Sequence, residues 1–390
     1  MKTQIGIVGA GPAGLVLSRL LDLQGISSVV LECKTREYIQ ERVRAGVLEQ
    51  GTVELLTEMG AGERLRREGL VHEGIELRFN HQAHRIDFRE LTGRSITIYP
   101  QAEVVRDLID LRLADHREIL FEVEGLSVHD AESKSPKIRF VHGGTRHELN
   151  CDFLAGCDGF HGVCRPSIPA GVLREYERIY PFGWLGILAE APPSSEEIVY
   201  ARHDRGFALL SMRSPELSRL YVQCRPDEDI SEWPDGRIWE ELQTRLSVPG
   251  WKLAEGAIVQ KGITGMRSFV VEPMQHGNLF LAGDAAHIVP PTGAKGLNLA
   301  VADVRVLARA FREFYSSRRR DLLDAYSATC LKRVWKVQRF SWWMTSMLHV
   351  FEDDSAFDRK RQVAELDYVT GSSAASKSLA ENYVGLPFED

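Results

Sequence analysis

The pattern Gly9-x-Gly11-x-x-Gly14 constrains the fold of this chain more than any other sequence feature. It lies between an apolar run, 4–8, and the stretch 15–24, in which apolar residues recur at helical spacing. In a strand-turn-helix unit the first glycine permits the tight turn, the second lets a pyrophosphate approach the backbone, and the third lets helix and strand pack closely. The free N–H groups of the helix N-terminus attract phosphate. The pattern therefore predicts a phosphate-binding turn that opens a βαβ unit.

A second apolar run, 28–32, completes this βαβ unit. It ends in Glu32, 18 residues after the last glycine of the pattern. A carboxylate at the end of the second strand accepts hydrogen bonds from the ribose hydroxyls in dinucleotide sites. The unit therefore predicts a dinucleotide cofactor, but it does not determine which one.

Length and composition narrow the class of protein. A chain of 390 residues is long enough for two to three domains of about 150 residues each. Its net charge of −7 argues against nucleic acid or an anionic membrane as the main partner. The six cysteines include no C-x-x-C pair, so neither a metal site nor a disulfide framework is indicated. This cysteine usage fits a reducing, cytoplasmic setting, which we expect for the protein. No apolar run is long enough to span a bilayer.

The pattern of apolar residues divides the chain into three regions. Region 181–267 contains short apolar runs separated by turns, which is typical of an antiparallel meander. We predict that it is a substrate domain inserted after a Rossmann-like domain, 1–180. Region 268–390 is predicted to be a helical C-terminal and dimer region, with one strand at 278–282 and a helix over 296–315. The predicted fold class is therefore mixed α/β.

The inserted domain presents a group of polar side chains. Its three predicted strands are 197–201, 206–213 and 218–225. Strand alternation brings four of their polar residues to one face: Tyr200, Ser211, Arg213 and Tyr221. Arg213 could form a two-pronged ion pair with a carboxylate, which makes a small aromatic acid a candidate ligand. Alternation alone is equally compatible with a solvated polar face of the sheet.

Two segments farther along the chain extend the nucleotide-binding pattern. Residues 281–287 read Leu-Ala-Gly-Asp-Ala-Ala-His, and residues 290–298 read Pro-Pro-Thr-Gly-Ala-Lys-Gly-Leu-Asn. Asp284 follows a predicted strand and is suited to hold a ribitol chain, while Gly293 bares the backbone near a helix start, where N–H groups stabilise negative charge. Both segments resemble the second flavin signature of FAD-dependent aromatic hydroxylases. The resemblance implies that the first domain holds FAD and not NAD.

The resemblance extends along the whole chain. A third segment, 157–165, is similar to the Asp-Gly signature of the same family, although Gly162 or its neighbour stands where serine is commonest. Longer blocks of similarity are 42–51, 69–74, 180–186, 267–277, 340–344 and 381–387. The resemblance implies a homodimeric flavoprotein monooxygenase of aromatic compound degradation. It would convert 4-hydroxybenzoate into 3,4-dihydroxybenzoate with O2 and NADH or NADPH, through a flavin hydroperoxide.

The resemblance also implies roles for residues around the substrate. Ser211, Arg213 and Tyr221 would hold the carboxylate. Pro291 and Thr292 would line the ring pocket. The catalytic residues would form a proton relay from the phenol oxygen to solvent, in the order Tyr200, Tyr383 and His72. A relay suits the chemistry, because a free phenol with a pKa of about 10 is mostly protonated at neutral pH and an electrophilic oxygen attacks a phenolate far better.

Two sets of cofactor-binding residues follow from the same resemblance. The FAD set comprises Gly9, Gly11, Gly14, Glu32, Arg42, Arg44, Gln101, Asp158, Asp284, Gly293, Leu297 and Asn298. The set for NADH or NADPH comprises Cys33, Lys34, Arg36, Tyr38, His161, Arg165, Arg219 and Arg267. Within these sets Arg44 would also contact the nicotinamide cofactor, and Arg219 would support the flavin where it is reduced. Asn298 would approach the polar edge of the flavin.

One departure from the family bears on the choice of reductant. After Glu32, the NADPH-dependent members carry Arg and then Gln, whereas this chain has Cys33 and Lys34. Lys34 or Arg36 could take the place of the missing arginine, but a lysine is a point charge where an arginine offers a fork. We therefore predict that both NADH and NADPH are accepted.

Two other functions stay open. A related flavin enzyme could act on another aromatic acid, by hydroxylation at a different position or by decarboxylating halogenation. The retained polar residues argue against it, as does the absence of the Trp-x-Trp-x-Ile-Pro run of one flavin halogenase class. A flavoprotein that binds its ligand without turnover, as a sensor, is the alternative outside the enzymes, and the complete proton relay argues against it.

Overall fold

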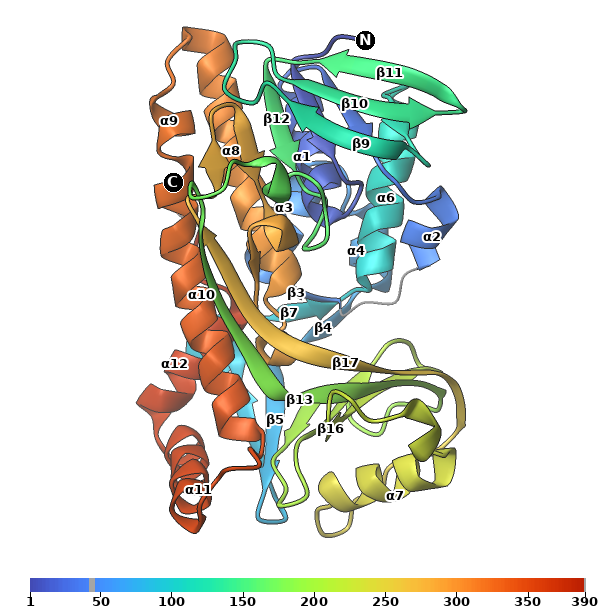
Figure 1. Ribbon diagram of the computed structural model, residues 1–390. Helices are drawn as coiled ribbons and strands as arrows, with labels where there is room; N and C mark the ends of the chain where they lie inside the picture. Colours follow the sequence, from blue (N-terminus) through green and yellow to red (C-terminus); the bar gives the residue numbers. More distant parts are fainter. Residues whose placement is uncertain (42–45, 389–390) are drawn as a thin grey trace.

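The computed structural model describes residues 1–41 and 46–388 (Figure 1). Two of the predicted FAD-binding residues, Arg42 and Arg44, therefore lie outside the described residues. A mostly parallel sheet stands at one end of the molecule and a larger sheet at the other, and the long C-terminal helix α10 (Tyr326–Leu348) runs along both (Figure 1). This arrangement confirms the predicted mixed α/β fold with a helical C-terminal region.

The first sheet contains the predicted βαβ unit. Its strand order is β18-β19-β12-β1-β2-β8, and all neighbours except β18 and β19 run parallel. The strands are β1 (Ile5–Val8), β2 (Ser28–Leu31), β8 (Ile119–Leu120), β12 (Phe153–Gly156), β18 (Gln275–His276) and β19 (Leu279–Leu281). Helix α1 (Pro12–Leu23) connects β1 to β2, as predicted. Pro12 suits the first turn of the helix, where a backbone N–H has no helical partner.

Helices and two small sheets surround this first sheet. Helix α1 packs against α8 (Gly296–Ser317), which confirms the helix predicted over 296–315. The remaining helices of this part are α2 (Arg36–Glu41), α3 (Gln50–Glu58), α4 (Glu63–Glu68), α5 (Phe88–Thr92) and α6 (Gln101–Ala114). The small sheets are β3 (Val47–Glu49), β7 (Ile96–Ile98) and β4 (Leu70–His72), and β9 (Glu124–His129), β10 (Lys137–His142) and β11 (Thr145–Asn150).

The larger sheet confirms the predicted meander and adds strands to it. Its order is β20-β17-β13-β16-β15-β14-β5-β6. The strands are β5 (Gly74–Phe79), β6 (Gln82–Asp87), β13 (Arg174–Glu190), β14 (Ile198–Ala201), β15 (Ala208–Met212), β16 (Ser218–Cys224), β17 (Ala257–Glu272) and β20 (His287–Ile288). Strands β14, β15 and β16 are antiparallel neighbours, as predicted, but β5 joins β14 in parallel from the region 1–180. The expected domain limits, 180/181 and 267/268, fall inside β13 and β17.

The two faces of the larger sheet contact different partners. Val199, Leu210 and Leu220 pack in a core with helix α7 (Asp235–Arg245). Tyr200 and Leu209 lie on the opposite face, in a second core with the C-terminal helices. These helices are α10 (Tyr326–Leu348), α11 (Ala356–Gly371) and α12 (Ser373–Val384), whereas the short α9 (Asp321–Asp324) packs in the core of the first sheet. The alternation read from the sequence therefore directs the candidate substrate residues toward the C-terminal helices.

Candidate active site

The glycine turn between β1 and α1 has the close packing that its sequence predicts. A Cβ atom on Gly14 would lie 2.0 Å from the carbonyl oxygen of Gly9, so no larger residue fits there. Gly9 has φ +103°, which favours glycine. A Cβ on Gly11 would meet nothing within 4 Å, so the backbone at this position faces open space. The turn thus leaves room for a phosphate beside the N-terminus of α1.

Glu32 shapes the same turn from the end of β2. Its side chain is buried, and its Oε2 accepts a hydrogen bond from the backbone N–H of Ala10 at 2.8 Å. Its Oε1 accepts another from the backbone N–H of Lys34 at 2.9 Å. The Cys33 thiol also donates to Oε1, at 3.5 Å, so it is Oε2, with one hydrogen bond, that retains acceptor capacity for ribose hydroxyls.

Asp158 follows β12, and its side chain lies against Gly162, where the family commonly has serine. Its Oδ2 accepts from the backbone N–H of Cys164 at 2.9 Å, and burial raises the pKa of its carboxyl. Its Oδ1 is buried and has no hydrogen-bond partner among the described residues. A Cβ on Gly162 would lie 2.1 Å from Cγ of Asp158, so glycine at 162 gives this carboxylate its place.

The second flavin segment follows β19. Asp284 is exposed within the short 3-10 turn Gly283–Ala285. The turn is anchored by Asp303 of α8, whose Oδ2 accepts from the backbone N–H of Gly283 at 3.0 Å and contacts Nε2 of His287 at 2.6 Å. Sequence reasoning did not single out Asp303; the only available signal was an acidic residue on the apolar face of a helix.

Residues 291–298 are fixed from two sides. Pro291 is exposed, whereas Thr292 is buried and its hydroxyl lies 2.9 Å from that of Thr345 on α10. Asn298 accepts from the backbone N–H of Glu49 at 2.9 Å and donates to the carbonyl of Val47, also at 2.9 Å. Its side chain thereby attaches the start of α8 to β3. Gly293 is buried and Leu297 half-buried in the same segment.

Two buried tyrosines meet beside this segment. The hydroxyls of Tyr200 and Tyr383 lie 2.5 Å apart, although 183 residues separate them in the chain. Burial raises the pKa of both phenols above the ordinary value. Lys295, also buried, donates to the backbone carbonyl of Tyr383 and to Oε1 of Glu49, both at 2.7 Å. Neither Lys295 nor Glu49 was predicted as a site residue, although a lysine within a buried glycine-rich segment is unusual.

His72, the predicted end of the relay, lies on β4. It is buried, and neither ring nitrogen has a hydrogen-bond partner within the described part of the chain. Burial lowers the pKa of His72 to about 4, against the opposing effect of the Glu197 carboxylate. The link from Tyr383 to His72 therefore stays a prediction.

The depressed pKa of His72 predicts how stability depends on pH. In the unfolded chain a histidine binds a proton below about pH 6.5, whereas folded His72 stays neutral until about pH 4. Between these pH values the unfolded state binds one more proton than the folded state. The stability of the folded protein therefore decreases as pH falls from about 6.5 to about 4. From pH 7 to pH 5, wild type should therefore lose about 2 kcal/mol more of its unfolding free energy than His72→Asn, which lacks this titrating group. Urea unfolding at both pH values measures it, and a constant difference would contradict the assignment.

The predicted carboxylate residues lie on the larger sheet. Tyr221 of β16 is opposite Leu209 of β15, which in turn is opposite Tyr200 of β14, so these residues form one cross-strand row. Ser211 lies one row away and donates to the carbonyl of Met212 at 3.3 Å. Burial lowers the pKa of Arg213, and the Tyr221 phenol opposes that shift.

Arg219 lies beside this group. Its Nε donates to the Tyr221 hydroxyl at 3.2 Å, and its Nη1 is buried without a partner among the described residues. A Cβ on Gly186 would lie 2.8 Å from Nη2 of Arg219, so this glycine, which sequence reasoning did not single out, makes room for the guanidinium. The unpaired donor is suited to a ligand acceptor.

The predicted nicotinamide residues fall in two places. The guanidinium carbons of Arg165 and Arg267 each lie 4.6 Å from the ring centroid of Phe160, and His161 contacts the same ring edge-on. The side chains of Arg165, Arg267 and His161 therefore all contact the ring of Phe160.

The second place is the segment after β2. Cys33 is exposed, Lys34 lies over the ring of Tyr38 at 5.6 Å, and Arg36 pairs with Asp110 at 2.6 Å. Gln101, predicted to contact FAD, is half-buried at the first position of α6.

These observations fit an FAD site. The open backbone at Gly11, the spare acceptor capacity of Glu32 and the unpaired Oδ1 of Asp158 are what a phosphorylated, hydroxyl-bearing cofactor needs. In the described ranges, no three His, Cys, Asp or Glu side chains gather to hold a metal ion, and no helix is long and apolar enough to cross a membrane.

Comparisons with known proteins point to the same cofactor. The model of the FAD binding domain family matches residues 2–341. The p-hydroxybenzoate hydroxylase of Acinetobacter baylyi (strain ATCC 33305 / BD413 / ADP1) is 49% identical over 391 residues, covering 100% of this chain and 96% of the relative. A probable NADH-specific resorcinol 4-hydroxylase of Rhodococcus jostii (strain RHA1) is 23% identical over 351 residues, covering 83% of this chain and 61% of the relative.

Solved structures share the fold. The p-nitrophenol 4-monooxygenase of Pseudomonas putida DLL-E4 superposes with a TM-score of 0.82 at 19% identity and covers 99% of both chains. This likeness bears on the fold alone. The family match over most of the chain and the full-length relative carry the assignment: the chain belongs to the family of FAD-dependent aromatic hydroxylases.

Proposed function

We propose that the protein is a monooxygenase that hydroxylates 4-hydroxybenzoate at the position next to its phenol, giving 3,4-dihydroxybenzoate, with O2 and NADH or NADPH consumed. The observation that carries the proposal is one sheet face with two chemically distinct ends. Tyr200, bonded to Tyr383, offers a phenol donor at one end, and Tyr221 with Arg219 and Arg213 offers donors and positive charge at the other. The 49% identical relative carries the matching name.

The two ends suit the two substituents of the substrate. Arg213 and Tyr221 would bind its carboxylate, with Ser211 as a further donor. Tyr200 would donate to its phenol oxygen, and its bond to Tyr383 would pass the proton onward, toward His72. Preorganised donors of this kind stabilise the phenolate, which is the reactive form. Thr292, with Pro291, would line the ring between these ends.

The cofactor roles are part of the same proposal. Bound FAD, reduced by the nicotinamide coenzyme, would activate O2, from which one oxygen atom enters the substrate and the other leaves as water. The glycine turn, Glu32, Asp158 and Asp284 would hold its nucleotide and ribitol parts, and Gln101, Gly293, Leu297 and Asn298 its ring. Arg42 and Arg44 are proposed on sequence alone. Region 1–180 would then bind FAD, region 181–267 would bind the substrate, and region 268–390 would supply the second flavin segment and the helical dimer contact.

Coenzyme oxidation and identification of the product test the proposal directly. The purified protein is supplied with FAD in air, and NADH and NADPH oxidation is recorded with and without 4-hydroxybenzoate, with product identified by chromatography. We expect 4-hydroxybenzoate to accelerate oxidation and 3,4-dihydroxybenzoate to accumulate. Oxidation that responds only to another aromatic acid would instead indicate a related hydroxylase, and ligand binding without oxidation would indicate a sensor.

The segment after β2 predicts weak discrimination between the reductants. Lys34 is the nearest cation to follow Glu32, and Arg36 is already paired with Asp110. We expect kcat/KM for NADH and NADPH to differ by less than about a hundredfold, or about 2.7 kcal/mol. Steady-state kinetics with each coenzyme measures the ratio. Lys34→Gln should lower the value for NADPH and leave that for NADH unchanged; a larger native preference would contradict the prediction.

We also propose a homodimer in the cytoplasm. Reduced nicotinamides are intracellular reactants, which supports the location. Helix α10 exposes Trp335 and Trp342, which supports a contact with a second copy. Light scattering during gel filtration tests the dimer.

A further inference from the structure

The end of helix α10 carries a buried histidine that the proposed mechanism does not use. His349 is completely inaccessible to solvent. Its Nδ1 lies 2.9 Å from the carbonyl oxygen of Thr345, and its Nε2 lies 2.7 Å from the indole Nε1 of Trp184 on β13. A carbonyl can only accept and an indole N–H can only donate. The imidazole is therefore neutral, with its proton on Nδ1, and burial accordingly lowers the pKa of His349 to about 3.

Ring stacking holds this imidazole in one plane. His349 lies between Phe182 and Phe207, with ring centroids 4.7 Å and 4.4 Å away and interplanar angles of 8° and 23°. Trp184 stacks on Phe207 at 5.0 Å and contacts the ring of Tyr221 at 4.8 Å. His349 thus supports Trp184, and Trp184 supports Tyr221, one of the proposed carboxylate ligands.

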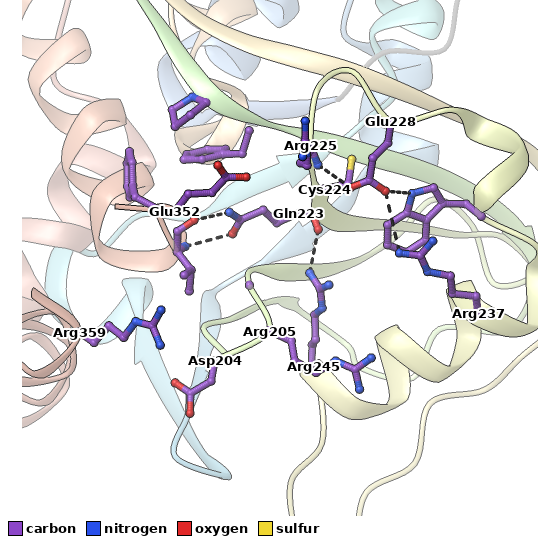
Figure 2. Close-up of a pocket in the computed structure, with 16 residues that line it drawn as sticks. Asp204, Arg205, Gln223, Cys224, Arg225, Glu228, Arg237, Arg245, Glu352 and Arg359 are labelled. Carbon is purple, nitrogen blue, oxygen red and sulfur yellow. Dashed lines mark hydrogen bonds and ion pairs between the residues drawn. The ribbon is translucent and has the colours of Figure 1, made fainter. Parts of the chain in front are cut away.

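The backbone after His349 is fastened to the same sheet. The Gln223 side chain donates to the carbonyl of Val350 at 2.5 Å and accepts from the N–H of Val350 at 3.1 Å. Gln223 also lines a cleft of about 280 Å³, together with arginines and acids that include Arg245 and Glu228. Figure 2 shows these side chains and the contacts of Gln223. Phe182 and Gln223 line this cleft too, whereas His349 does not. Gln223 therefore fixes the backbone next to His349 on the side of the cleft, while Trp184, Phe182 and Phe207 hold the imidazole itself.

We propose that His349 is a positioning residue for the substrate: as an Nδ1–H tautomer it accepts the indole N–H of Trp184 and so fixes the ring against which Tyr221 rests. This inference rests on the proposed function, because it concerns the carboxylate end of the site. Without the acceptor, the buried indole N–H has no partner, and Trp184 can turn away from Tyr221. FAD affinity should not depend on this contact, because the described residues of the proposed FAD set lie outside β13, β16 and α10; Arg219 of β16 is expected only to support the flavin where it is reduced.

Two variants separate the contacts of His349. His349→Gln can place an amide oxygen near the Nε2 position and keep the acceptor for Trp184. His349→Asn places its amide near the Nδ1 position and loses that acceptor. The affinity of the FAD-loaded enzyme for 4-hydroxybenzoate is measured by isothermal titration calorimetry, with FAD affinity measured in parallel. We expect His349→Asn to raise the substrate Kd about tenfold, His349→Gln to raise it less, and neither to change FAD affinity.

A double-mutant cycle tests whether the effect passes through Trp184. Trp184→Phe should raise the substrate Kd, and His349→Asn in that background should add less than about twofold. Trp233→Phe is the control, because Trp233 is also a buried tryptophan whose indole donates to a side chain, that of the half-buried Glu228 at 2.7 Å, but it has no contact with His349 or Tyr221 among those given for the described residues. Its substrate Kd should stay at the wild-type value.

Three results would overturn the inference while leaving the proposed function intact. They are a wild-type Kd in His349→Asn, independent effects of the Trp184 and His349 changes, and an equal rise in Trp233→Phe. If His349→Asn does not fold, His349→Gln still tests the inference. A substrate Kd in His349→Gln as high as in Trp184→Phe would show that an acceptor at this position does not hold Trp184 in place. Wild-type enzyme that fails to bind 4-hydroxybenzoate would contradict the proposed function itself.

Discussion

Replacing Tyr200 by phenylalanine should lower the yield of 3,4-dihydroxybenzoate per coenzyme oxidised by about tenfold or more. The bound phenol then loses its donor and stays largely protonated at neutral pH, because the pKa of a free phenol is about 10. A hydrogen bond to a charged group contributes about 1.5–3 kcal/mol, which corresponds to about 10-fold to 150-fold. Coenzyme oxidation should continue, so that reducing equivalents pass to O2 without product.

Chromatographic product yield against coenzyme oxidised measures this effect. Tyr180→Phe is the matched control, since Tyr180 is equally buried in the same core and its hydroxyl contacts Ser268 at 3.3 Å, away from Tyr383. The control should keep the wild-type yield, and Tyr383→Phe should share the defect. A normal yield in Tyr200→Phe would remove the tyrosine pair from the mechanism.

The second large effect is expected at Arg213. Arg213→Lys should raise KM for 4-hydroxybenzoate by about 10-fold to 100-fold, because an ammonium makes a single contact where the guanidinium makes two parallel ones. Burial already opposes the charge of Arg213, as the lowered pKa of its guanidinium indicates. A shorter cation at this position therefore has less to offset its desolvation.

Steady-state kinetics with 4-hydroxybenzoate varied and coenzyme saturating measures this KM. Arg225→Lys provides the comparison: Arg225 follows β16 directly, and its exposed side chain pairs with Asp227 at 3.1 Å. Arg225→Lys should leave KM for 4-hydroxybenzoate unchanged. If Arg213→Lys has a normal KM for 4-hydroxybenzoate, the carboxylate binds elsewhere.

Local sequence patterns predicted the parts of the fold that depend on neighbours in the chain. The glycine turn with α1, and the strands β14 to β16, follow from turn residues and from spacing of 3.6 or 2 residues. The same spacing placed Tyr200 and Tyr221 on one face, and the cross-strand row confirms it.

Contacts between distant segments were not predictable in this way. No pattern in residues 74–87 indicates that β5 pairs with β14, about 120 positions later. The pairing of Lys295 with Glu49 spans 246 positions, and that of His349 with Trp184 spans 165. Even where the local sequence is unusual, as at Lys295, the role of each residue depends on a distant partner that periodicity cannot identify. Tyr383 also depends on a distant partner, Tyr200, and was therefore predicted from the family resemblance and not from periodicity.

The strand order of the first sheet has a consequence for how the chain folds. Strand β1 pairs with β12, and β12 pairs with β19, so the central part of the sheet joins residues 5, 153 and 279. Pairings this distant in sequence are slow to form, because a long loop must close before each contact is gained. During synthesis β1 can pair early with β2, but its pairing with β12 requires residue 153, and the pairing of β12 with β19 requires that most of the chain has left the ribosome. A chain truncated before β19 would remove two strands from this sheet, because β18 joins it only through β19, and would leave the edge of β12 open to association with other chains.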